Sequence, residues 1–166
     1  MKLINHNSIT IKKIEIFFTL SLLLFSCSTN PNYERNLATA KKIFELHGQE
    51  DLEGQLNFVS KEIKSVLPMY GSEPVGYEDY ANIIKIYHNA FDDLKYTADT
   101  WLPGTDGMGN LDGSVRTYGN WTGFKNIITG KKLNLNGYWC FNFDDTGLIN
   151  EQGDFFDVGG YRRCVF

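Results

Sequence analysis

The chain has 166 residues, of which 42% are hydrophobic and 14% aromatic, and its formal net charge at pH 7 is −4. This apolar content suffices for a packed core and excludes a disordered chain. The acidic balance, without a cluster of Lys and Arg, excludes nucleic acid as a partner.

The N-terminal segment has the parts of an export signal. Lys12 and Lys13 precede an apolar run over residues 14–25. That run is shorter than the ~20 residues that a membrane-spanning helix needs. It ends at a small residue directly before Cys27, as in the bacterial lipoproteins that this segment resembles.

From this resemblance we expect residues 1–26 to be a cleaved signal peptide and Cys27 to carry an acyl chain such as palmitate. Residues 27–32 are then a lipidated tether. The expected location is the bacterial cell envelope, where the lipid anchor holds the protein to a membrane on its periplasmic or surface side. The alternative is an ordinary secretory signal, which leaves Cys27 as an incidental free thiol.

The remainder, residues 33–166, predicts a single domain that begins with helices. Apolar residues recur three and four apart over residues 33–46 and again over residues 77–94, the spacing of a helix with one buried face. Between them, residues 50–58 predict a short second helix. Residues 62–68 alternate between polar and apolar and predict a strand.

After the second long helix the pattern changes to a period of two, which is typical of strands. Strands are expected over residues 96–102, 114–122, 133–143 and 148–158, with Gly-rich and Asp-rich turns between them. Helices followed by consecutive strands predict an α+β fold. Two further cysteines, Cys140 in the third of these strands and Cys164 near the C-terminus, either pair or stay separate thiols.

Four phrases in the C-terminal half resemble the SnoaL-like polyketide cyclase branch of the nuclear transport factor 2-like superfamily. Residues 115–123 end in a G-x-x-x-G phrase, and residues 129–133 begin with Thr-Gly-Lys. Residues 141–149 resemble the F-x-F-x-D-G-K-I hairpin, and residues 149–157 resemble the closing strand I-x-E-x-W-D-x-x-D. The resemblance implies a cone-shaped fold, in which N-terminal helices pack on a strongly curved antiparallel or mixed β-sheet and leave an apolar pocket.

Aromatic residues on three successive predicted strands are the candidates for lining this pocket, because an aromatic cavity with a few polar groups is the usual form of a small-molecule site. Alternation along a strand places about half of them on the inner face. Each ring equally suits a plain role in the core. The candidate pocket residues are Tyr118, Trp121, Tyr138, Trp139, Phe141, Phe143 and Phe156.

Asp154 is the candidate catalytic residue. The resemblance implies that it matches the Asp of the cyclases that removes a proton next to a carbonyl group. An acid in an apolar pocket suits this task, because desolvation raises its pKa toward neutral pH. The sequence departs from the family where Gln152 and Gly153 replace the usual His and Trp, so the proton-relay or binding partner of the base that the resemblance implies is lost. The alternative is a hydrogen-bonded strand Asp with no catalytic role.

Four other polar residues have candidate or plainer roles. Asp99 lies in a predicted strand and is a candidate for the same pocket. His88 lies on the long helix, where it either overhangs the pocket mouth or sits on the helix surface. Asp157, near a strand end and before two glycines, is expected to cap a turn, and His47 is expected to interact with the end of the first helix.

The sequence shows no zinc-ligand spacing, no phosphate-binding glycine loop and no nucleophile motif. We therefore expect no metal and no cofactor. Three functions remain open. The first is a lipid-anchored pocket that binds a small, mostly apolar molecule. The second is a cyclase or isomerase with Asp154 as base and Tyr118 or Tyr138 polarising the carbonyl. The third is an interaction module that dimerises through the outer face of its sheet.

Overall fold

The computed structural model describes residues 30–124 and 130–165, with side chains as far as residue 162. The predicted signal peptide and Cys27 lie outside the described residues. Helices and strands follow one another in the order α2, Tyr33–Gly48; α3, Leu52–Leu56; β1, Val59–Val66; α4, Tyr77–Ala90; β2, Lys95–Thr105; β3, Leu111–Gly123; β4, Leu133–Phe143; β5, Ile149–Phe156; and α5, Val158–Val165.

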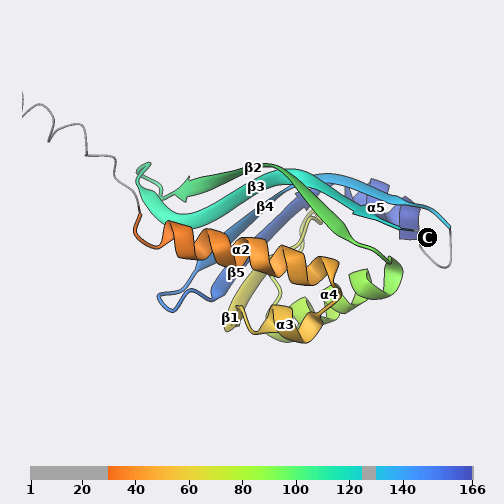
Figure 1. Ribbon diagram of the computed structural model, residues 1–166, viewed down its shortest axis with the longest axis horizontal. Helices are drawn as coiled ribbons and strands as arrows, with labels where there is room; N and C mark the ends of the chain where they lie inside the picture. The colour runs from red at the N-terminus through yellow and green to blue at the C-terminus, as the bar shows by residue number, and fades with distance from the viewer. Residues whose placement is uncertain (1–29, 125–129, 166) are drawn as a thin grey trace, which may run out of the picture.

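The five described strands form one sheet in the order β1-β5-β4-β3-β2. The four strands from β2 to β5 pair antiparallel with their neighbours, whereas β1 pairs parallel with β5. Figure 1 shows this sheet as a curved layer, with α2, α3 and α4 on one side of it. The α+β fold with helices packed on a curved mixed sheet is therefore confirmed.

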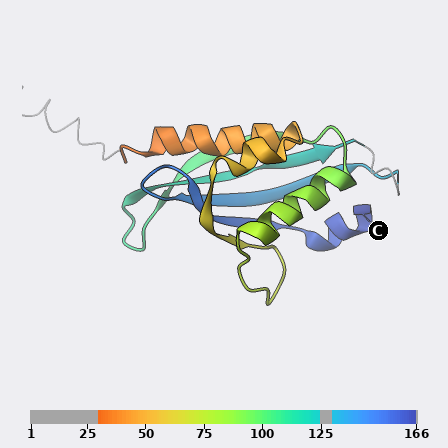
Figure 2. The same ribbon diagram turned by 90° about the horizontal axis from the view of Figure 1, so that it is seen from below.

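Helices α2 and α4 each bury one stripe of apolar residues against the sheet. On α2 the buried side chains include Ala40, Ile43 and Phe44, and on α4 they are Tyr80 and Ile84. These positions are three or four residues apart, so they share one helix face. Seen from below, the helices lie in front of the sheet (Figure 2).

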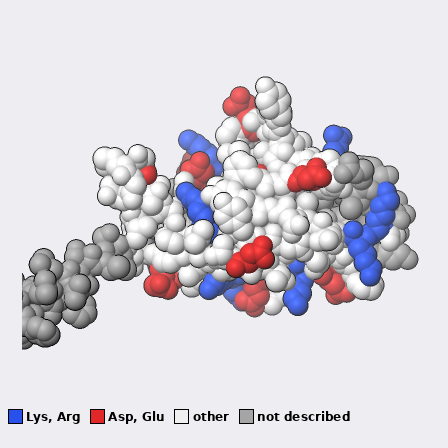
Figure 3. Space-filling model, turned by 90° about the horizontal axis from the view of Figure 1, so that it is seen from above, with Lys and Arg blue, Asp and Glu red and all other residues white. Residues whose placement is uncertain are grey.

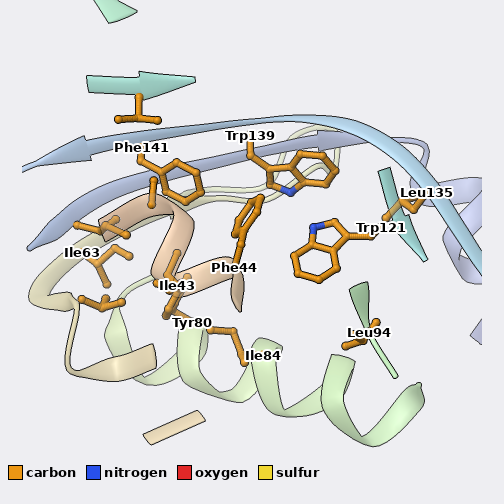
Figure 4. Packing of buried hydrophobic residues seen from close by; sticks show 14 of the residues in the cluster. Ile43, Phe44, Ile63, Tyr80, Ile84, Leu94, Trp121, Leu135, Trp139 and Phe141 are labelled. Carbon is orange, nitrogen blue, oxygen red and sulfur yellow. The ribbon is translucent and has the colours of Figure 1, made fainter. Parts of the chain in front are cut away.

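Phe44 is the centre of the core. Its ring lies 4.5 Å from that of Tyr96, 5.2 Å from that of Trp121 and 5.4 Å from that of Phe141, measured between centroids. The ring pairs are tilted or edge-on, the arrangements that aromatic quadrupoles favour. Figure 4 shows Phe44 beneath the curved strands, between Trp121 and Trp139.

The chain differs from expectation at the end of one helix and in the presence of another. The helix predicted for residues 77–94 stops at Ala90, because Phe91 adopts an extended backbone and Asp93 a left-handed one with φ of 52°. The turn that follows leads directly into β2. Helix α5 was not predicted, because Gly159 and Gly160 lie in it and glycine disfavours helices.

The structure also places Asp157 and Cys140, for which the sequence analysis gave expectations. Asp157 lies directly before α5, and its carbonyl accepts a hydrogen bond from the backbone N–H of Tyr161 at 3.0 Å. Cys140 is a free thiol whose Sγ lies 3.7 Å from the carbonyl oxygen of Gly153. The side chain of Cys164, with which a disulfide was one of the two possibilities raised above, lies outside the described residues.

Candidate functional site

A cavity of about 80 Å³ lies between the helices and the inner face of the sheet. Its wall combines rings from the helices and from the central strands with a small number of polar side chains. Among its lining residues are Phe44, His47, Gln55, Tyr80, Ile84, Tyr87, Trp121, Trp139, Gln152, Asp154 and Phe156. An apolar wall with few polar groups is the composition of small-molecule sites.

The alternation of β5 places Asp154 on this wall. Asp154 is paired with Trp139 of β4, and Gln152 with Phe141, so both side chains point to the inner face. Asp154 is only 7% exposed and Gln152 only 9% exposed. A buried carboxylate is unusual, because removing its charge from water costs free energy unless a partner compensates.

Gln152 provides that partner and is itself held by the helix layer. Its Nε2 donates a hydrogen bond to Oδ1 of Asp154 at 2.9 Å, and its Oε1 accepts one from the hydroxyl of Tyr80 at 3.0 Å. The two bonds fix the orientation of the amide, since only its oxygen accepts from Tyr80 and only its nitrogen donates to the carboxylate. The chain Tyr80–Gln152–Asp154 thus connects α4 to β5.

Burial raises the pKa of Asp154 to about 6, although the hydrogen bond from Gln152 partly opposes this change. The same burial, with the nearby Asp154 charge as a second cause, raises the pKa of Tyr80 and of Tyr87 well above the ordinary value. Both phenols therefore keep their protons at neutral pH, and Asp154 changes charge close to it. A carboxylate with a pKa near neutrality has the property required of a general base.

The opposite wall carries a second polar group. The Nδ1 of His47 lies 3.3 Å from Oε1 of Gln55 and 3.1 Å from Nε2 of His88. Burial, with the charge of His88 as a second cause, lowers the pKa of His47 to about 3, so His47 is neutral at physiological pH. His88 does not line the cavity but lies behind His47, half-buried on α4.

The aromatic residues predicted for the pocket occupy three different places. Trp121, Trp139 and Phe156 are on the cavity wall. Phe141 is fully buried beside Phe44, and Phe143 is packed against the core, so neither lines the cavity. Both lie near the C-terminal end of β4, past Trp139, which is on the cavity wall.

Tyr118 and Tyr138 differ from the prediction, because they lie on the outer face of the sheet. Tyr118 is 48% exposed, and its ring is 4.8 Å from that of Tyr138, its direct partner across β3 and β4. Aromatic residues occur on both faces of these strands, so alternation alone does not reveal which set faces inward. Neither hydroxyl is available to polarise a substrate in the cavity.

Asp99 is exposed and does not line the cavity either. It is the additional residue of an irregularity in β2, because Ala98 pairs with Gly119 and Thr100 with the preceding residue of β3, Tyr118. From this point on, the irregularity shifts the alternation of inward and outward side chains along β2. A regular strand was assumed in the prediction.

Several polar residues of the cavity were not predicted, four of which come from the helices. His47 and Gln55 come from α2 and α3, and Tyr80 and Tyr87 from α4. The prediction treated Gln152 only as a residue that replaces a partner of the base. Gln152 lies two residues before Asp154, shares the inner face of β5 with it and donates a hydrogen bond to its carboxylate. In the sequence, this spacing of two residues was the signal that both side chains share one face of the strand. Within the described residues, no three His, Cys, Asp or Glu side chains are grouped to hold a metal ion.

Comparison with known proteins reveals similarity in structure rather than in sequence. No protein-family model matches the sequence, and no curated protein sequence matches it. Solved structures do match over most of the chain. Bal32a from a soil-derived mobile gene cassette superposes with a TM-score of 0.66 at 16% identity, over 81% of this chain and 99% of Bal32a.

Two further structures agree with the first. A Jannaschia sp. CCS1 protein assigned to the SnoaL-like polyketide cyclases gives a TM-score of 0.66 at 14% identity, covering 83% of this chain and 96% of its own. An NTF2-like protein of unknown function from Burkholderia pseudomallei K96243 gives 0.62 at 16% identity, covering 78% and 96%. The chain has the nuclear transport factor 2-like fold.

In this nuclear transport factor 2-like fold, Asp154 and Gln152 stand on the inner face of the last strand, and α4 covers them. The fold agrees with the resemblance read from the four C-terminal phrases. At these identities it establishes the architecture, and the chemistry of the site has to be argued from the residues themselves.

Proposed function

We propose that the cavity binds a small, largely apolar carbonyl compound and that Asp154 removes a proton next to the carbonyl. One observation carries the proposal: a single carboxylate, 7% exposed, stands on the wall of an aromatic cavity. No salt bridge with Asp154 is found among the described residues. Desolvation by the cavity supplies the raised basicity that proton abstraction from carbon requires.

The proposed step is an enolisation. The carboxylate of Asp154 takes the proton, the electron pair of the broken C–H bond moves into the carbonyl group, and an enolate forms. Tyr87 is the residue that we assign to donate a hydrogen bond to the enolate oxygen, in place of Tyr118 or Tyr138. It lines the cavity, keeps its proton at neutral pH and lies close enough to Asp154 for the carboxylate charge to raise its pKa.

The size of the cavity supports a small ligand. A cavity of about 150 Å³ lined by apolar side chains accommodates benzene. The cavity here, at about 80 Å³, is smaller. The site thus suits a compact ketone better than a multi-ring polyketide.

The test is deuterium exchange at the α-carbons of 2-butanone in D₂O, followed by ¹H NMR with and without the protein. We expect the protein to accelerate exchange and Asp154→Asn to abolish the acceleration while leaving the affinity for the ketone nearly unchanged. Glu151→Gln, on the opposite face of the same strand, is the matched control and should exchange normally. Binding without any acceleration would leave a pocket that binds only, and the base would be withdrawn.

We further propose that the chain is a lipoprotein held to the bacterial envelope through Cys27. The support is the sequence before and at Cys27. None of the described helices is long and apolar enough to cross a membrane. In bacteria fed an alkyne analogue of palmitate, the wild-type protein should be labelled and sediment with membranes. Cys27→Ser should lose both properties and Cys140→Ser neither. An unlabelled wild-type protein would contradict the anchor.

The outer face of the sheet favours a second role, association of two copies of the domain. Tyr118 is 48% exposed and Phe155 49%, and both contact Tyr138 in a row across three strands. Viewed from the sheet side, the molecule has a broad uncharged surface with scattered charges (Figure 3). Exposed apolar patches commonly mark interaction sites. Sedimentation should give a concentration-dependent dimer that the double variant Tyr118→Ser, Phe155→Ser disrupts, and a strict monomer would contradict this role.

A further inference from the structure

The cavity has a second polar end, formed by His47 and Gln55. His47 lies in the last turn of α2 and Gln55 in α3, and both line the cavity. They contact each other through Nδ1 of His47 and Oε1 of Gln55, which are 3.3 Å apart. Gln55 is only 3% exposed. A buried amide beside an imidazole is costly to maintain unless its hydrogen-bonding groups are used.

Each of these two side chains has one nitrogen that is not used by the protein. Among the described residues, neither Nε2 of His47 nor Nε2 of Gln55 has a hydrogen-bond partner. His47 is neutral, so its ring carries one N–H and one lone pair. Its Nδ1 faces Gln55 and its Nε2 is left for whatever occupies the cavity.

The pair offers the cavity one donor and one acceptor, whichever way the amide is turned. If Nδ1 of His47 carries the proton and donates to Oε1 of Gln55, the ring presents a bare Nε2 and the amide presents its NH₂. If the amide is reversed and donates to Nδ1, the ring presents Nε2–H and the amide its oxygen. The tautomer of His47 and the orientation of the Gln55 amide change together. In either arrangement the pair therefore presents one donor and one acceptor to the cavity.

The two polar ends of the cavity are separated by aromatic surface. Tyr87 lies between them, because its ring is 6.1 Å from that of His47 and its hydroxyl interacts with the charge of Asp154. Trp121 also contacts the His47 ring, with centroids 4.9 Å apart. A ligand that occupies the whole cavity therefore meets Asp154 at one end, apolar rings along its length and the pair of His47 and Gln55 at the other end.

We propose that His47 and Gln55 bind a ligand group that both donates and accepts a hydrogen bond, and that the substrates are small ketones bearing a hydroxyl group. A hydroxyl is the smallest group that makes both bonds at once. The inference rests on the proposed function, which places the carbonyl end of the ligand at Asp154. It adds a second specificity site from different elements of the fold.

His88 is a positioning residue for this site. Its Nε2 contacts Nδ1 of His47 at 3.1 Å from α4, and His88 itself does not line the cavity. With Gln55 as a second contact at the same atom, the ring is held so that its other nitrogen is left for the ligand. Removing His88 should loosen the ring without removing the ligand contact itself.

The experiment compares two ketones that differ only by a hydroxyl group, 2-butanone and 4-hydroxy-2-butanone. Their dissociation constants are measured by ¹H–¹⁵N NMR titration of the mature domain beginning at Ser28 and of variants whose spectra show a folded protein. One net hydrogen bond corresponds to about fivefold in affinity. We expect the hydroxyketone to bind about fivefold more tightly to the wild type and no more tightly than 2-butanone to His47→Phe or Gln55→Leu.

Further variants separate contact from support. In Glu151→Gln the preference should stay at the wild-type value, and in Asp154→Asn it should also persist, because the hydroxyl end does not meet the carboxylate. In His88→Phe the preference should fall part of the way. The ratio of the two affinities is the decisive quantity, since general loosening of the cavity weakens both ketones alike.

A measurement on the wild type does not depend on any variant folding. Intermolecular NOEs should connect the protons of the hydroxyl-bearing carbon to the ring protons of His47. Equal affinity for the two ketones, a preference that survives both cavity variants, or the absence of these NOEs overturns the second site and leaves the proposed function standing. If neither ketone perturbs the residues of the cavity, both proposals are overturned.

Discussion

The side chains of Gln152 and Asp154, two residues apart on one strand, are joined by a hydrogen bond of 2.9 Å inside the cavity. The bond stabilises the charged form of the carboxyl group, whereas burial stabilises the neutral form. The charge state of Asp154 near neutral pH is the balance of these two effects. Tyr80 contributes to this balance, because its hydroxyl donates a hydrogen bond to the Gln152 amide and holds it in place.

Replacing Gln152 by Met should raise the pKa of Asp154 further above its present value of about 6. The reason is that burial continues while the one hydrogen bond to the carboxylate is lost. The measurement is a ¹³C NMR titration of the Asp carboxyl resonances. Asn142→Leu is the control, since it removes an amide–carboxylate bond of 2.7 Å to Glu151 on the outer face. A lower Asp154 pKa in Gln152→Met would contradict this account.

Asp154 should also make the fold less stable as the pH rises. Its pKa is about 6 when folded and 3.8 ordinarily, so the folded state binds more protons between these values. The free energy of unfolding therefore falls through this range, by about 3 kcal/mol in total. Asp154→Asn removes the loss and should be more stable than the wild type at pH 8, as measured by urea denaturation. Equal stabilities at pH 8 would show that the carboxylate is not desolvated.

His47 should have the opposite effect on the pH dependence of stability. Its pKa is lowered from 6.5 to about 3, so the unfolded state binds more protons between these values and stability is lost as the pH falls. His88, whose pKa is also lowered, acts in the same direction. In Asp154→Asn the free energy of unfolding should rise steadily from pH 4 to pH 7. Adding His47→Phe to Asp154→Asn should reduce this rise in the free energy of unfolding. An unchanged rise would mean that His47 is exposed to water in the folded state.

Phe44→Ala should destabilise the domain more than any other single truncation of an α2 side chain. The ring contacts five aromatic residues from three strands, and a cavity would remain in their midst. Burial of this kind is worth about 4 kcal/mol on removal of Phe. Chemical denaturation measures the loss, with Phe44→Leu as the milder control. A loss below about 1 kcal/mol would mean that the helix layer is held elsewhere.

Gly119→Ala should disturb the pairing of β2 with β3. A Cβ at this position would lie 2.5 Å from the carbonyl oxygen of Thr97 and 2.5 Å from the hydroxyl of Tyr96. Relieving the overlap moves Tyr96 away from Thr117, to which it is hydrogen-bonded at 2.8 Å. We expect a cost of about 1–3 kcal/mol in thermal or chemical denaturation. Gly107→Ala, with no atom within 4 Å of its Cβ, should cost far less.

The sequence by itself determined most of the element types and the fold class. The helices expected over residues 33–46 and 77–94 and the four C-terminal strands follow from periods of 3.6 and 2, which depend only on local backbone geometry, whereas α5 was not predicted. The order of these elements indicated an α+β fold. The match of Asp154 to the closing strand of a known family singled out a carboxylate that lines the cavity.

Only the tertiary structure decided which side chains share the cavity. Tyr80 meets Gln152 across 72 residues and His88 meets His47 across 41, distances in sequence that no periodic pattern spans. The faces of Tyr118 and Tyr138 were undecidable for a related reason, since both faces of β3 and β4 carry aromatic rings. Such choices depend on the curvature and register of the sheet and on the packing of helices over it, which emerge only when the whole chain folds.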